Sequence, residues 1–161
     1  MGQPRRVLAV ASGGGHWVQL CRLAPAWDGC DVTYVTTQKG YREVVSRMAA
    51  ERGQTPPGFF VVTEVNRWQK GRILKALVQL VWILLRCRPD VIITTGAAPG
   101  AMALRIGSLM GCRTVWIDSI ANSEKLSMSG GKVAGFTDLW LTQWPHLADE
   151  QKGPRYRGSV I

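Results

Sequence analysis

A chain of 161 residues can bury one substantial hydrophobic core but is too short for two complete α/β domains. Its 20 lysines and arginines outnumber 11 acidic residues, and the net charge of +9 favours anionic partners such as a phospholipid surface, a diphosphate or a nucleic acid. The four cysteines form no C-x-x-C pair, so neither a zinc site nor a disulfide framework is indicated, and a reducing compartment fits. The first apolar run begins at Val7, which leaves no room for a secretion signal.

A glycine-rich turn follows the first expected strand, residues 7–11, and leads into a helix. The turn has three glycines in succession and is followed at once by His16. Without Cβ atoms, backbone N–H groups can approach a phosphate closely, and the helix dipole adds roughly half a positive charge at the helix start. Glycine is also the default residue of a tight strand-to-helix turn, so the glycines alone leave a purely structural role open. The histidine favours an anion site.

Two common nucleotide motifs do not fit this turn. A dinucleotide fingerprint requires a third glycine where Val18 stands, and the second strand ends in two threonines instead of a ribose-binding acid. A P-loop requires Gly-Lys-Ser/Thr at the helix start, where this chain has Gly15-His16-Trp17. The sequence therefore predicts neither a nicotinamide enzyme nor a Walker-type nucleotidase, and we expect no cofactor.

Strands and helices alternate along the rest of the chain. Apolar runs predict further strands at residues 31–37, 59–65, 89–95, 113–118 and 138–143, with helices at 41–52, 69–87 and up to 110 between them. This alternation is typical of parallel βαβ units. It predicts a single α/β domain over residues 1–161, with a Rossmann-like, doubly wound parallel sheet of about six strands and a C-terminal connector at 145–161.

The helix expected at 69–87 is apolar nearly all round and flanked by cations. It is shorter than the roughly 20 apolar residues that span a bilayer. Two interpretations remain open. The helix lies in a membrane interface, with tryptophans at headgroup depth and cations on anionic lipid, or it packs in the core on the sheet. The residues expected to meet the membrane are Trp68, Arg72, Lys75, Trp82 and Arg86.

A second small-residue turn, residues 96–100, follows the fourth strand. In the strand order 3-2-1-4-5, ligands bind beyond the carboxyl ends of the strands, at the switch point between the first and fourth strands. We therefore expect both small-residue turns and the Asp118-Ser119 pair to converge there. Two structural alternatives remain. The second loop can simply be a tight turn, and Asp118 can cap the segment that follows it.

Four motifs in the same order resemble a known family over nearly the whole chain. They are S-G-G-G-H, P-D-V-I-I-T-T-G-A-A-P-G, W-I-D-S-I-A-N-S-E-K-L-S-M-S-G and L-T-Q-W-P. They resemble the membrane-recruiting, acceptor-side subunit of two-chain GT-B glycosyltransferases. That subunit is known from the eukaryotic enzyme that adds the second N-acetylglucosamine to dolichol diphosphate and from bacterial exopolysaccharide pairs of the PssD/PssE type. The N-terminal half of MurG is a more distant resemblance.

The resemblance implies the acceptor-side domain of a glycosyltransferase of polysaccharide or lipid-linked oligosaccharide biosynthesis. A separate chain would hold the UDP-sugar, and the heterodimer would transfer its hexosyl or glucuronosyl group, with inversion, to a polyprenyl-diphosphate-linked acceptor. The expected location is the cytoplasmic face of the membrane, as a peripheral or monotopic protein. Eukaryotic members usually carry an N-terminal membrane span that is absent from this sequence, and many have Glu where this chain has Asp118.

The same resemblance suggests roles for individual residues. His16 would orient the diphosphate or act as the catalytic base, for which a neutral imidazole is suited. No Asp-x-Asp pair occurs, so a metal-independent reaction is expected. Candidate contacts with the acceptor are Asp118, Ser119 and Ser127. The residues expected to hold the acceptor diphosphate are Ser12, Gly13, Gly14, Gly15, Gly96, Ala97 and Gly100.

Two other functions are compatible with the composition. A non-catalytic scaffold that brings a catalytic chain to the membrane would depend on the helix at 69–87 and tolerate changes at His16. A nucleic-acid-binding domain is disfavoured, because the sequence has no helix-turn-helix, RNP or zinc-finger pattern and its tryptophans lie mostly in apolar runs.

Overall fold

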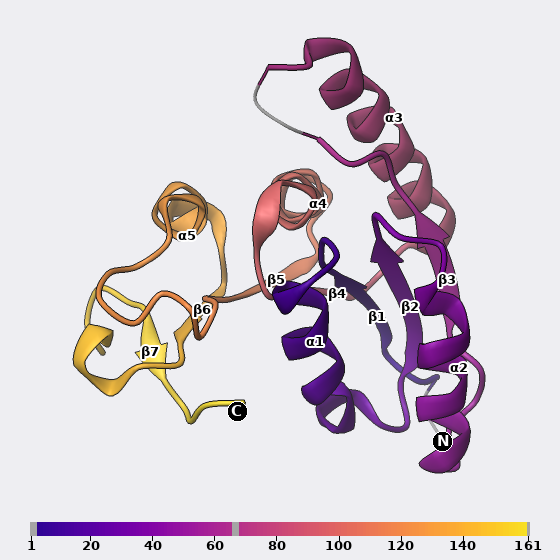
Figure 1. The fold of residues 1–161 in the computed structure, drawn as a ribbon, viewed down its shortest axis with the longest axis horizontal. Coiled ribbons are helices and arrows are strands. Elements are labelled where there is room, and N and C mark those ends of the chain that lie inside the picture. The colour runs from indigo at the N-terminus through magenta and orange to yellow at the C-terminus, as the bar shows by residue number, and fades with distance from the viewer. Residues whose placement is uncertain (1–2, 66–67, 161) are drawn as a thin grey trace.

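The structure, a computed structural model, describes residues 3–65 and 68–160. Its centre is a seven-stranded parallel sheet with the strand order β3-β2-β1-β4-β5-β6-β7 (Figure 1). The strand order is the expected one, with its switch point between β1 and β4. The strands are β1 (Arg6–Val10), β2 (Asp31–Thr36), β3 (Gly58–Val61), β4 (Val91–Thr94), β5 (Arg113–Ile117), β6 (Leu139–Thr142) and β7 (Arg155–Tyr156).

The sheet has seven strands, where the sequence predicts about six. β7 lies inside residues 145–161, the segment expected to be a connector, and pairs with β6 through Leu141↔Arg155 and Thr142↔Tyr156. It is two residues long and has no apolar run, so the sequence pattern carries no signal for it. Pairing with the exposed edge of β6 is what makes it a strand.

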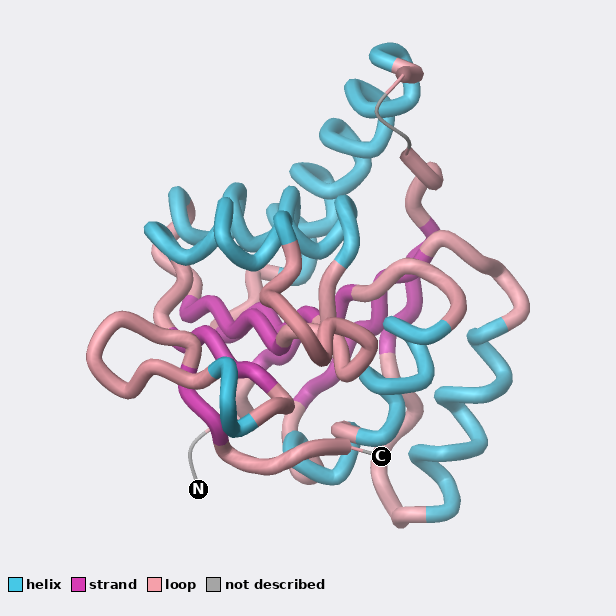
Figure 2. The backbone as a smooth tube through the Cα atoms, turned by 60° about the vertical axis from the view of Figure 1, so that its left-hand side comes forward, coloured by secondary structure: helices cyan, strands magenta, loops and turns pink. Residues whose placement is uncertain are grey.

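Helices cover both faces of the sheet (Figure 2). One face carries α1 (Gly15–Arg22), a short 3₁₀ turn (Ala24–Trp27) and α2 (Tyr41–Glu51), and the other carries α3 (Lys70–Cys87), α4 (Ala97–Leu109) and α5 (Met128–Val133). Two further 3₁₀ turns lie at Ala134–Phe136 and Pro145–Leu147. This is the doubly wound α/β arrangement that the alternating elements predict.

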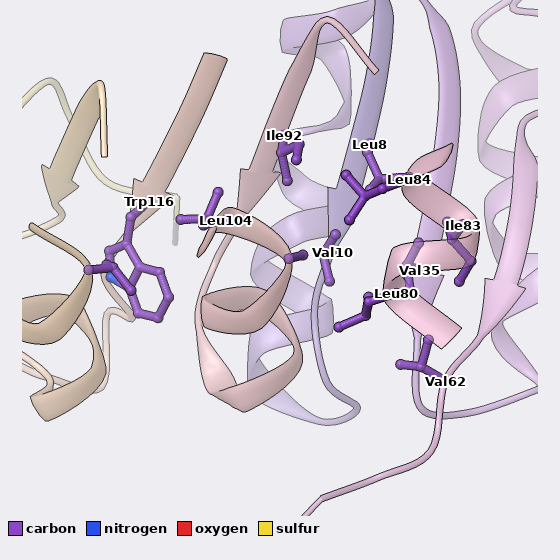
Figure 3. Packing of buried hydrophobic residues seen from close by; sticks show 12 residues of the cluster. Leu8, Val10, Val35, Val62, Leu80, Ile83, Leu84, Ile92, Leu104 and Trp116 are labelled. Atoms are coloured by element: carbon purple, nitrogen blue, oxygen red, sulfur yellow. The ribbon is translucent and has the colours of Figure 1, made fainter. Parts of the chain in front are cut away.

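Two hydrophobic clusters hold the layers together. Successive residues of β1 point to opposite faces, so Leu8 and Val10 join the α3/α4 side, while Val7 and Ala9 join the α1/α2 side. Both faces are buried, which explains why β1 is a continuous apolar run instead of an alternating one. The α3/α4 cluster is shown in Figure 3, where Leu80 and Leu84 of α3 and Leu104 of α4 lie close to side chains of the strands.

The helix α3 has two apolar faces. Ala76, Leu80, Ile83 and Leu84 are buried against the sheet. The opposite face is also apolar but exposed, and it consists of Leu74, Leu77, Val78, Val81, Trp82 and Leu85. The core interpretation is therefore correct for one face, while a second face of similar length is left uncovered by this chain. Among the described residues, no helix is both long enough and apolar enough to cross a bilayer.

Candidate functional site

The first turns of α1 and α4 lie side by side at the carboxyl edge of the sheet. β1 and β4 are paired with Val10 opposite Thr94, so the two following turns start at the same level. Two hydrogen bonds then join them directly. The Thr95 hydroxyl donates to the carbonyl oxygen of His16 at 2.7 Å, and the His16 ring donates through Nδ1 to the carbonyl oxygen of Thr95 at 2.8 Å.

The bond to Thr95 determines which ring nitrogen of His16 is available for chemistry. A carbonyl oxygen can only accept, so Nδ1 carries the hydrogen and the lone pair of the neutral ring lies on Nε2. The ring sits against Gly96, where a Cβ atom would lie 2.8 Å from Cε1 of His16. Gly96 also has a φ of 124°, which side chains rarely adopt. The histidine is thus held with Nε2 free to accept a proton.

The start of α1 presents backbone donors, whereas the start of α4 has fewer, because the N–H of Gly96 donates to the Thr94 hydroxyl at 3.1 Å and Pro99 has no N–H. The first hydrogen bond within α1 runs from the N–H of Val18 to the carbonyl of Gly14, which leaves the N–H groups of Gly15, His16 and Trp17 without an acceptor inside the helix. Within the described part of the chain, neither α1 nor α4 has a side-chain cap at its N-terminus. Paired, uncapped helix starts are suited to an anion with more than one phosphate group.

The loop between β2 and α2 and the first residue of α2 also border the site, which the sequence patterns did not predict. The Thr37 hydroxyl accepts from the N–H of Gly13 at 3.3 Å, and the Tyr41 hydroxyl accepts from the N–H of Gly14 at 3.4 Å. The Tyr41 ring stacks on Trp17, with centroids 4.7 Å apart and planes 5° from parallel. The donors of Gly13 and Gly14 therefore have partners in the protein. The two threonines at the end of β2 are the signal of this contact in the sequence.

The other residues expected to hold the diphosphate differ in their surroundings. Gly100 is buried in α4, where a Cβ would collide with the side chain of Thr94, so its small size allows α4 to pack closely on β4. Ala97 begins α4 with a positive φ of 67° beside Gly96. The Ser12 hydroxyl donates to the carbonyl of Gly13 at 3.4 Å. A role of these residues in binding phosphate stays a prediction.

The candidate acceptor contacts after β5 have structural partners. Asp118 is only 1% exposed, and its carboxylate accepts from the N–H groups of Ser119 and Ser127, both at 3.1 Å, and from Nδ2 of Asn122 at 2.7 Å. Ser127 caps α5 by accepting from the N–H of Gly130 at 2.9 Å. The carboxylate thus organises the loop it begins, and the helix cap is Ser127. Contact with an acceptor stays a prediction for Asp118, Ser119 and Ser127.

The residues expected to meet a membrane lie on the exposed side of α3 or just before it. Trp68 is 90% exposed and Trp82 is 55% exposed, and the guanidinium of Arg86 lies 5.9 Å from the Trp82 ring centroid. Arg72 and Lys75 are exposed on the first turns of α3. These turns extend beyond the carboxyl edge of the sheet, the edge that also carries the two helix starts (Figure 1). The exposed face of α3 and the candidate site therefore adjoin the same end of the molecule.

Within residues 3–65 and 68–160, no three His, Cys, Asp or Glu side chains gather closely enough to hold a metal ion. Burial raises the pKa of Cys21 on α1 to about 11, so its thiol stays protonated at neutral pH and is a poor nucleophile. Metal independence of the reaction stays a prediction.

Comparison with known families gives a match over more than half of the chain. The family described as "Oligosaccharide biosynthesis protein Alg14 like" matches residues 68–160. The UDP-N-acetylglucosamine transferase subunit ALG14 of Eremothecium gossypii is 26% identical, over 99% of this chain and 82% of the relative. The human protein of the same name is 21% identical, over 96% of this chain and 82% of its own length.

Solved structures are similar in fold. MurG from Acinetobacter baumannii superposes with a TM-score of 0.71 at 14% identity, over 98% of this chain but only 46% of MurG. The UDP-N-acetylglucosamine 2-epimerase of Rickettsia bellii has a TM-score of 0.63 at 11% identity, over 93% of this chain and 40% of the epimerase. The chain thus has the Rossmann-like α/β fold that it shares with parts of MurG and of the epimerase, and it spans less than half of each of these proteins.

Replacing Gly96 by alanine tests how the histidine is held. We expect Gly96→Ala to lower the free energy of unfolding by about 1–3 kcal/mol, because the new methyl group requires a strained φ and pushes against the His16 ring. Gly15→Ala is the matched control, since no atom lies within 4 Å of its Cβ position. Chemical denaturation of both variants checks this, and equal stabilities would contradict it.

Proposed function

Because the chain belongs to the family of Alg14-like oligosaccharide biosynthesis proteins, we propose that it is the acceptor-side subunit of a two-chain glycosyltransferase. Its curated relatives are named as subunits of a UDP-N-acetylglucosamine transferase. The chain spans less than half of MurG and forms one Rossmann-like domain. In this proposal a second chain binds the UDP-sugar, and the present chain binds a polyprenyl-diphosphate-linked acceptor in polysaccharide biosynthesis.

The observation that carries the proposal is the pairing of two uncapped helix starts through His16 and Thr95. A diphosphate has two phosphate groups a few ångströms apart. One can accept from the N–H groups at the start of α1 and the other from those of Ala97 and Ala98 at the start of α4. Both helix dipoles and the net charge of +9 favour an anion here. The acceptor diphosphate therefore lies across the turns at 13–16 and 96–100.

His16 then acts as the base of the transfer. Its Nε2 takes the proton of the attacking acceptor hydroxyl, whose oxygen forms a bond to the anomeric carbon of the donor sugar. The bond from that carbon to UDP breaks on the opposite face, and its electron pair leaves with UDP, so the anomeric configuration inverts. Groups of the partner chain stabilise the departing UDP without a metal. The names of the relatives make UDP-N-acetylglucosamine the first donor to test.

The exposed apolar face of α3 is the membrane contact of the proposed complex. Its side chains lie on one side of the helix, and Lys75 and Arg86 flank them. This arrangement is typical of helices that lie in the headgroup region on anionic lipid. Since α3 begins at the carboxyl edge, a polyprenyl chain that leaves the site can enter the bilayer beside it. The protein thus sits on the cytoplasmic face as a peripheral or monotopic subunit.

Removal of one backbone donor tests the diphosphate site. Gly15→Pro deletes the N–H of the first residue of α1, where proline is compatible with a helix. We expect it to weaken binding of farnesyl diphosphate about 10- to 100-fold, the effect of one hydrogen bond to a charged group. Gly15→Ala keeps the N–H and should bind like the wild type. Isothermal titration measures both, and equal affinities would count against the site.

Replacement of His16 separates catalysis from scaffolding. The amide of His16→Gln can still donate a hydrogen bond, but it cannot take a proton. In the complex purified with its donor-binding chain, we expect kcat for transfer from UDP-N-acetylglucosamine to a farnesyl-diphosphate-linked sugar to fall by about 10²–10⁴, with KM for the donor unchanged. Full activity of His16→Gln would favour the alternative of a non-catalytic membrane scaffold.

The membrane contact is tested on vesicles of phosphatidylglycerol and phosphatidylcholine. Trp82→Ser should weaken binding about tenfold or more, because it removes a large apolar side chain from the exposed face of α3. Val18→Ser is the control, since Val18 is an exposed apolar residue on α1, at 49% exposure. Co-sedimentation at two salt concentrations gives the affinities. Identical binding of both variants would exclude α3 as the contact.

A further inference from the structure

A buried glutamine lies one helical turn after the glycine turn. Gln19 is 5% exposed, and its side-chain amide has four partners from three segments of the chain. Its Nε2 donates to the carbonyl of Gly15 at 3.3 Å and to the hydroxyl of Ser119 at 3.0 Å. Its Oε1 accepts from the N–H of Ile120 at 3.0 Å and from Nε2 of Gln143 at 2.7 Å. Both donors and both acceptor positions of the amide are used.

Only an amide satisfies this set of partners. The carbonyl of Gly15 requires a donor, and the N–H of Ile120 requires an acceptor, so the two ends of the side chain must differ. A carboxylate lacks the donor, and an apolar side chain lacks both. Since a buried polar group without a partner is unfavourable, the amide holds the first turn of α1 and the loop after β5 in one relative position.

A second buried amide extends the arrangement. Gln143, at the end of β6, is 2% exposed, and its Nε2 donates to Gln19 and to the carbonyl of Asp118 at 3.0 Å. Its Oε1 accepts from the N–H of Val160 at 2.9 Å. The bonds all run in one direction, from Val160 to Gln143, to Gln19 and to Gly15. In such a series each bond polarises the next, which strengthens the whole chain.

We propose that Gln19 and Gln143 are positioning residues, two amides in series that hold the first turn of α1, and with it His16, relative to the loop after β5 and to residues 159–160. The consequence for catalysis rests on the proposed function. The positioning itself does not, because it concerns the geometry of the unliganded chain. His16 follows Gly15 directly, so a shift of the Gly15 carbonyl moves the ring away from the Thr95 carbonyl.

The tautomer of His16 reports this position. The chain has two histidines, and the structure gives them opposite tautomers: Nδ1–H for His16, which donates to Thr95, and Nε2–H for His146, which donates to the Ser123 carbonyl at 2.7 Å. Long-range ¹H–¹⁵N spectra of the protein with ¹⁵N-labelled histidine distinguish the two forms. In each ring, the nitrogen that donates to a carbonyl oxygen carries the hydrogen, so this hydrogen bond sets the tautomer.

We expect Gln19→Met and Gln143→Met each to shift His16 from the Nδ1–H form towards Nε2–H. The matched control is Gln54→Met, whose amide accepts from the N–H of Gly29 at 2.7 Å and donates to the Arg52 carbonyl at 3.1 Å, far from the site. It should leave His16 unchanged. If Gln19→Met does not fold, Ser119→Ala removes a single partner of the amide and should give a smaller shift in the same direction. A folded Gln143→Met or Ser119→Ala with wild-type His16 signals would overturn the proposal.

Transfer kinetics in the complex with the donor-binding chain separate the two proposals. Gln143→Met should lower kcat about tenfold and leave KM for UDP-N-acetylglucosamine unchanged, since Gln143 lies outside both helix starts. If Gln143→Met shifts the His16 tautomer but keeps the wild-type kcat, and His16→Gln is active, the positioning role stands and His16 is not the base. If Gln143→Met keeps the wild-type kcat while His16→Gln is inactive, the two amides have no effect on catalysis and that part of the proposal is rejected.

Discussion

Two hydrogen bonds between His16 and Thr95 are the constraint on which the rest of the site depends. They join the turn after β1 to the turn after β4, so that two helix starts without side-chain caps point to one place. They also fix the hydrogen of the imidazole on Nδ1 and leave Nε2 free. The glycine at position 96 makes this possible, because any side chain there would occupy the space of the ring. The proposed anion binding and the proposed proton acceptance thus depend on one contact.

Helix α3 shows how one element can belong to the core and still expose a second apolar face. Leu80 and Leu84 pack on the strands, while Val78 and Trp82 on the other side contact solvent in the isolated chain. Exposed contiguous apolar surface is rare on proteins that act alone, and it generally marks an interaction surface. The cations beside this face and its position at the carboxyl edge support a lipid surface as the partner. The acceptor site and its proposed lipid then share one end of the molecule.

The opposite side of the site is polar and buried. Asp118, Gln19 and Gln143 fill the space between α1 and the ends of β5 and β6. Each has its hydrogen-bonding groups matched to backbone and side-chain partners. Hydrophobic attraction has no preferred direction, whereas the hydrogen bonds of amides and carboxylates require a donor and an acceptor in a defined geometry. The polar cluster therefore specifies where the loops lie, and the apolar clusters supply the stability of the sheet.

Periodicity and glycine placement in the sequence determined the alternation of strands and helices and the extent of α3, because these depend on local propensity. The turns at 13–16 and 96–100 meet because the sheet has the strand order that general rules for doubly wound sheets suggest. Tertiary structure decided the rest. Strand β7 exists only through pairing with β6, and Tyr41 reaches Gly14 only when α2 packs beside α1. Gln19 and Gln143 are 124 residues apart, and their bond depends on where the folded backbone places two ends of strands and helices. Hydrogen bonds of such long range leave no periodic trace in a sequence, so only the packed chain shows which polar residues serve the site.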